Sequence, residues 1–165
     1  MLSLSLMLLG WIFTFTPPFQ KFVTFLHEFG HYLHLMLVIR KYNLSMPNPV
    51  IHVCPKPVSI YLIPQYQGKT FSTAYTYLEQ NELAIDIVLN ALAGFLFCIA
   101  TTLLPAILLV CFLMIDLALG YLFGMLPSLI LQISNFIHSS DWKYIWHPER
   151  FQYISICTKC GYHHP

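Results

Sequence analysis

The almost continuous apolar stretch from Leu83 to His138 restricts the fold of this chain more than any other feature. Its main interruptions are Asp86, Pro105, Asp116 and Pro127. A helix needs roughly 20 apolar residues to cross the hydrocarbon core of a bilayer. The stretch is therefore predicted to hold two or three membrane helices, with breaks near Pro105 and between Gly120 and Pro127.

Two shorter apolar runs precede this stretch, at residues 1–16 and 19–39, and Pro17-Pro18 separates them. The first run has neither a basic leading segment nor a small-residue cleavage site, so we interpret it as a short first membrane segment and not as a removable signal peptide. Only 9% of the residues are charged and 57% are hydrophobic. Because so few charges cannot cover the water-facing surface of a small chain, the sequence predicts an integral, multi-pass protein of the lipid bilayer.

The charges nearly balance, with 8 Lys and Arg against 7 Asp and Glu. A protein that binds nucleic acid through its phosphates needs a basic surface, and this composition does not provide one. We therefore expect no nucleic-acid partner.

Residues 40–82 differ from the apolar runs because they carry basic residues, several prolines and many Tyr and β-branched residues. The segment Val58–Ile63 alternates weakly and precedes Gln67-Gly68, which is a turn signal. We interpret this region as a membrane-side loop with short β structure. The prediction is an all-α polytopic membrane protein with about four to five membrane helices. A single membrane-embedded domain would cover residues 1–142, and a polar tail would cover residues 143–165.

The second apolar run contains the motif His27-Glu28-Phe29-Gly30-His31. Histidines at i and i+4 share one face of a helix, where both imidazoles can bind one metal ion. Glu28 cannot reach the same point as a third ligand, but it can hold a metal-bound water and accept its proton. The alternative is that these polar groups only form a helix–helix contact. Ionisable groups at bilayer depth are costly and usually functional, which favours the metal site.

This motif in a membrane helix resembles the site-2 protease family of intramembrane zinc metalloproteases. Three other segments are similar to that family. Ile60–Pro64 with Gly68–Thr70 resembles its β-rich segment, and Asn90–Gly94 resembles the start of its next membrane helix. Asp141 resembles the carboxylate ligand that follows the family's late hydrophobic segment. The resemblance implies a zinc metalloendopeptidase that hydrolyses peptide bonds of membrane-protein or peptide substrates. It also implies Zn²⁺ held by His27, His31 and Asp141, with Glu28 as the base.

The chain departs from the family pattern at two positions around the predicted third ligand. The family usually has Asn-x-x-Pro before the aspartate and glycine directly after it, whereas this chain has Gly124 before Pro127 and Trp142 after Asp141. Three other residues therefore stay open as the third ligand: Asp116, His138 and Glu82. For His34, which shares the histidine face of the motif helix, we expect a supporting role.

The C-terminal tail offers a possible second metal site, because Cys157, Cys160 and His163 have the order of one zinc knuckle. A closed structural zinc site needs four ligands, so a solvated tail with two free thiols is the alternative. Two other functions also stay open for the whole chain. One is a membrane di-iron oxygenase, which would need several paired-histidine segments. The other is a catalytically inactive relative that binds metal or a partner helix without cleavage.

Overall fold

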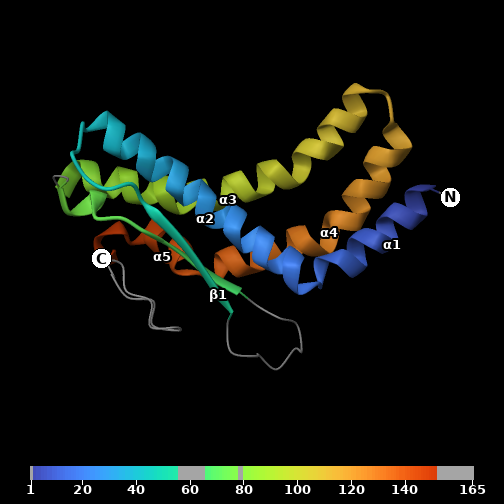
Figure 1. Ribbon diagram of the computed structural model, residues 1–165, viewed down its shortest axis with the longest axis horizontal. Helices are drawn as coiled ribbons and strands as arrows, with labels where there is room; N and C mark the ends of the chain where they lie inside the picture. The colour runs from blue at the N-terminus through green and yellow to red at the C-terminus, as the bar shows by residue number, and fades with distance from the viewer. Residues whose placement is uncertain (1, 56–65, 78–79, 152–165) are drawn as a thin grey trace.

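The computed structural model of the chain describes residues 2–55, 66–77 and 80–151. It is mostly helical, with one two-stranded antiparallel sheet (Figure 1). The longer elements are, in chain order, α1 (Leu2–Thr14), α2 (Pro17–Lys41), β1 (Val50–Pro55), β2 (Tyr66–Phe71), α3 (Gln80–Cys111), α4 (Ile115–Ile137) and α5 (Ser140–Trp146). Two short 3₁₀ helices, η1 (Ala74–Tyr77) and η2 (Pro148–Arg150), complete the described part.

Within the described residues, three helices are long and apolar enough to cross a membrane: α2, α3 within Leu83–Cys111, and α4. The protein is therefore a multi-pass membrane protein, as its composition predicts. The first apolar run forms α1, which at 13 residues is shorter than a typical span. Pro17 and Pro18 occupy the first turn of α2, where the missing backbone N–H groups of proline remove no helical hydrogen bond.

The breaks predicted within the long apolar stretch are in the wrong places. Pro105 lies inside α3 and Pro127 inside α4, and the chain turns at residues 112–114. Leu113 has a φ of 60°, and Met114 N–H donates to Leu109 O at 2.8 Å, so a tight left-handed cap ends α3. A proline costs a helix one hydrogen bond, whereas a helix broken inside the bilayer would leave several backbone groups without partners.

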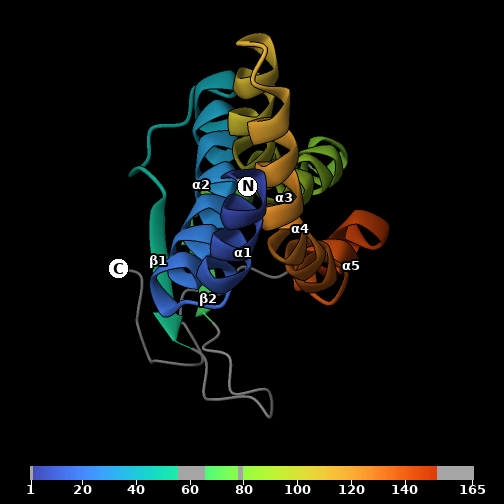
Figure 2. The same cartoon turned by 90° about the vertical axis from the view of Figure 1, so that its right-hand side faces the viewer.

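The hairpin of β1 and β2 packs along α2, on the side of the helices opposite α5 (Figure 2). Its register pairs Val53 with Gly68 and Ile51 with Thr70. Gln67 and Gly68 therefore lie inside β2 and not in the predicted turn. The Val58–Ile63 segment lies outside the described residues. This arrangement places the motif helix α2 between a sheet on one side and α3 with α5 on the other.

A polar contact joins the end of α2 to the start of α3. Tyr42 donates its hydroxyl proton to the buried carboxylate of Asp86 at 2.9 Å, and Lys41 Nζ lies 3.6 Å from the same oxygen. The hydroxyl of Tyr75 donates to the backbone oxygen of Asp86 at 3.2 Å. The loop region thus fixes the two helices at one end, close to the buried residues Leu35 and Val38.

Candidate metal centre

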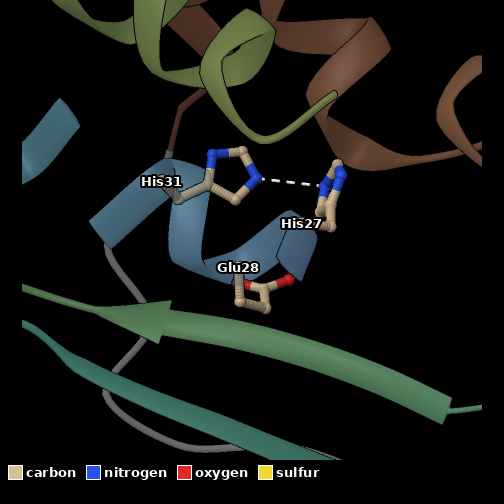
Figure 3. Close-up of side chains that lie close together, drawn as sticks. All are labelled: His27, Glu28 and His31. Atoms are coloured by element: carbon tan, nitrogen blue, oxygen red, sulfur yellow. Dashed lines mark hydrogen bonds between the residues drawn. The ribbon is translucent and has the colours of Figure 1, made fainter. Parts of the chain in front are cut away.

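The three polar residues of the motif point in two directions from α2 (Figure 3). His27 and His31 are one turn apart, and their imidazoles face α3 and α5. Glu28 is rotated by one residue and faces the hairpin. Together these side chains form a cluster that could hold a metal ion, because one ligand atom from each lies within 4.8 Å of the others.

The structure brings Asp141 to the two histidines, although it follows them by more than 100 residues. Asp141 Oδ2 lies 3.0 Å from His27 Nε2 and 3.4 Å from His31 Nε2. The two Nε2 atoms are 3.1 Å apart. Three potential ligand atoms from α2 and α5 thus form a nearly equilateral triangle.

The dimensions of this triangle suit zinc. Ligand atoms about 2.0–2.1 Å from a tetrahedral Zn²⁺ are about 3.3 Å from one another. The three measured distances of 3.0, 3.1 and 3.4 Å lie close to that value. Two imidazole nitrogens and one carboxylate oxygen are also a donor set typical of zinc sites that keep a fourth position open.

Helix α3 orients His31 through its backbone. His31 Nδ1 donates to the backbone oxygen of Asn90 at 2.7 Å, so in the neutral imidazole the lone pair is on Nε2, the nitrogen nearer Asp141. The next turn of α3 presents Gly94, where an added Cβ would lie 2.5 Å from His31 Nε2 and 2.8 Å from the backbone oxygen of His27. Gly30 on α2 meets the same part of α3, since its Cβ would lie 2.5 Å from Ala93 O. The two glycines allow the backbones to approach and leave room around His31 Nε2.

The hairpin holds Glu28, whose side chain is buried. Thr70 Oγ1 lies 2.9 Å from Glu28 Oε2 and 2.9 Å from the backbone oxygen of Glu28, so its single proton is available to either oxygen. Glu28 Oε1 lies over Gly68, where a Cβ would come within 2.6 Å of that oxygen. Strand β2 therefore packs closely against the Glu28 carboxylate, and only a glycine at position 68 leaves room for it.

Asp141 is positioned by a helix cap and an aromatic stack. Ser139 Oγ accepts a hydrogen bond from the N–H of Trp142 at 3.4 Å and so begins α5 one residue before the aspartate. The Trp142 ring packs edge-on against Phe136 and Trp146, at centroid distances of 5.7 and 5.8 Å. Trp142, which follows Asp141 directly, thus anchors α5 on the end of α4.

Asp141 also has an altered acidity. Burial by itself raises the pKa of this carboxyl group, but the charges and hydrogen bonds of His31 and His27 outweigh burial and hold the pKa below its ordinary value. The aspartate is therefore ionised at neutral pH, as a metal ligand must be.

The other residues considered for the third ligand have different positions. Asp116 is exposed in the first turn of α4, about 30 Å along that helix from α5 at 1.5 Å per residue. His138 lies at the end of α4 and lines the same cavity as the cluster, with its Nδ1 2.7 Å from Ser134 O. Glu82 lies in α3, but its side chain is outside the described part of the chain. Cys157, Cys160 and His163 of the predicted second site are also outside it.

Two findings at the site do not follow from the motif. Gly124, where the site-2 protease family usually has asparagine, contacts α1, because its Cβ would lie 2.9 Å from Leu6 O. It therefore serves helix packing. Helix α4 contributes two amides to the cavity, Asn135 and the buried Gln132, and neither was selected from the sequence. Two amides within an apolar helix are the signal that could have identified them.

Comparison with family models, with curated protein sequences and with solved structures finds no match to this chain. Its own residues define its class. It is a multi-pass membrane protein with a His-Glu-His cluster on an apolar helix, and this cluster could hold a metal ion.

Proposed function

We propose that this protein is an intramembrane zinc metalloprotease of the site-2 protease type, which hydrolyses peptide bonds of membrane-protein substrates. The observation that carries the proposal is the triangle of His27 Nε2, His31 Nε2 and Asp141 Oδ2, with a glutamate beside it on a membrane helix. In this proposal the two histidines and Asp141 hold the zinc. When bound there, zinc would polarise the scissile carbonyl and make a water molecule acidic enough to react near neutral pH.

Glu28 acts as the general base in this proposal. Thr70 Oγ1 is within hydrogen-bond distance of Glu28 Oε2, and the carboxylate packs closely over Gly68, so strand β2 holds in place the group that takes the proton. The same carboxylate then returns the proton to the leaving amine. Positioned acid–base groups of this kind contribute about 10²- to 10⁴-fold to the rate.

The cavity provides the setting that hydrolysis needs inside a membrane. It has a volume of about 590 Å³ and reaches from the cluster to the hairpin, α4 and α5. Its lining includes amides and hydroxyls from several elements, which allow water to enter a region otherwise enclosed by apolar helices: Gln20, Thr24, Gln67, Asn135 and Ser139. A substrate segment must unwind there, because a peptide carbonyl inside an intact helix is not accessible.

The first test is zinc content, measured by mass spectrometry on detergent-purified protein. We expect one zinc per chain from the cluster, and a second would come from the cysteine tail. The second test is co-expression with a single-span reporter whose membrane segment is interrupted by Gly and Pro. Glu28→Gln should abolish reporter cleavage and leave the zinc content unchanged.

Two outcomes would contradict the proposal. If wild-type protein prepared without chelators holds no zinc, the proposed metal site is wrong. If cleavage persists in Glu28→Gln, the proposed role of Glu28 as the base is wrong. Zinc binding without cleavage in either protein would instead favour the inactive, metal-binding alternative.

A further inference from the structure

Two amides that line the cavity, Asn90 and Gln132, have a buried oxygen without a hydrogen-bond partner among the described residues, and Gln132 is the one held from both sides by hydroxyls. Gln132 lies on α4, is 8% exposed and lines the same cavity as the metal cluster. Its Oε1 is buried and has no hydrogen-bond partner among the described residues. A buried polar atom left without a partner lowers stability, so such atoms are rare and need an explanation.

The orientation of this amide is determined by the neighbouring hydroxyls. Thr102 Oγ1 donates its only proton to the backbone oxygen of Cys98 at 2.8 Å, so it can only accept from Gln132. The group that faces Thr102 at 3.3 Å must therefore be the NH₂ of Gln132, which also lies 3.1 Å from Ser128 Oγ. With the NH₂ held between α3 and α4, Oε1 is left as a buried acceptor without a partner in the wall of the cavity.

The missing donor has a clear chemical description. An acceptor at this place needs an N–H or O–H group brought by whatever enters the cavity. A peptide segment that unwinds inside the bilayer exposes backbone N–H groups that have lost their helical partners, and each of them is costly to leave unpaired. Gln132 Oε1 and such an N–H group would form a hydrogen bond, so neither would remain without a partner.

We propose, on the basis of the proposed protease function, that Gln132 Oε1 accepts a hydrogen bond from one backbone N–H of the substrate. This contact positions the unwound segment in the cavity by its backbone and not by its side chains. It also sets a specificity: the substrate residue opposite Gln132 cannot be proline, because proline has no N–H.

The test is binding of a tripeptide hydroxamate to detergent-purified, zinc-loaded protein, together with its singly N-methylated forms. Each methyl group removes one backbone N–H. In the wild type, methylation at one position should weaken binding by about tenfold or more, as expected for a lost hydrogen bond to a buried acceptor. In Gln132→Met, which keeps a side chain of similar length, methylation at that position should change binding no more than methylation elsewhere.

Acetohydroxamate, which binds zinc but has no peptide backbone, is the matched control ligand. It should bind wild type and Gln132→Met equally. Thr102→Val, which removes the hydroxyl that holds the amide, should reduce the sensitivity to methylation partly. If N-methylation weakens binding to wild type and to Gln132→Met equally at every position, while acetohydroxamate still binds, the role of Gln132 is wrong and the protease proposal stands. If acetohydroxamate does not bind the wild type, the metal site and both proposals are wrong.

Discussion

Two helix crossings in this protein both use glycine to bring backbones close together, but they place different side chains beside the contact. At the α2–α3 crossing, Gly30 and Gly94 bring two backbones together, and the side chains beside them are His27, His31 and Asn90. At the α1–α4 crossing, Gly10 meets the backbone of Gly124, where a Cβ would lie 2.7 Å from the carbonyl carbon. At that second crossing, the indole of Trp11 makes a polar contact and donates to Phe123 O at 2.9 Å.

The difference shows that close packing of two helices does not by itself create a metal site, which also needs ligand side chains at the crossing. Small residues allow membrane helices to approach in both places. Only at the first crossing do the neighbouring side chains converge, because α5 adds a carboxylate from outside the bundle. The predictions below separate these contributions, from the largest expected effect to the smallest.

The largest effect is expected from Asp141→Ala, which removes the carboxylate from the first crossing. Zinc affinity should fall more than about 100-fold. Loss of a group that only supports a ligand typically lowers affinity by about 10- to 100-fold, so the larger loss identifies a ligand. Competition with a chromogenic chelator on detergent-purified protein measures this value. Asp116→Ala is the matched control and should bind zinc like the wild type; a similar loss in both variants would argue against Asp141 as a ligand.

The next effect is expected from Gly94→Ala. The new methyl group would lie 2.5 Å from His31 Nε2, so the imidazole must move away from its present position. Zinc affinity should fall about 10- to 100-fold, as for a disturbed supporting group. The same chelator titration tests it, and unchanged affinity in a folded variant would show that His31 Nε2 does not face the metal.

The corresponding change at the second crossing is Gly124→Ala. Its methyl group would lie 2.9 Å from Leu6 O and would push α1 from α4. Overpacking of this kind costs about 1–3 kcal/mol of stability. Thermal unfolding in detergent should therefore occur at a lower temperature, while zinc affinity per folded molecule stays unchanged. A loss of zinc here would mean that the two crossings are coupled.

The smallest effect is expected from Ser139→Ala, which removes the cap before α5. Loss of a helix cap costs about 1 kcal/mol, and the helix it begins holds Asp141. We expect zinc affinity to fall less than in Gly94→Ala, and Ser139→Asp, which restores a capping oxygen, to recover it. Failure of the aspartate variant to recover affinity would indicate that the cap does not position Asp141.

The sequence determined the class of protein and half of the site. Few charges and long apolar runs require a bilayer, and the spacing of His27 and His31 requires a shared helix face, because both follow from local composition and helix period alone. The hairpin was predicted as β structure, but its register was not, since Gln67-Gly68 is compatible with a turn until the pairing with β1 is known. The breaks in the long apolar stretch were misplaced because proline is tolerated in membrane helices.

Only the tertiary structure decided which distant groups meet the motif. Asp141 was expected from a resemblance, and nothing local distinguished it from Asp116 or His138. Its distances to the histidines depend on how α5 is capped and stacked against α4. The supporting contacts of Thr70 with Glu28 and of Gln132 with Thr102 join residues more than 25 positions apart, and no local pattern encodes them. A helix period fixes which residues share a face, whereas the packing of helices and the hairpin fixes what that face meets.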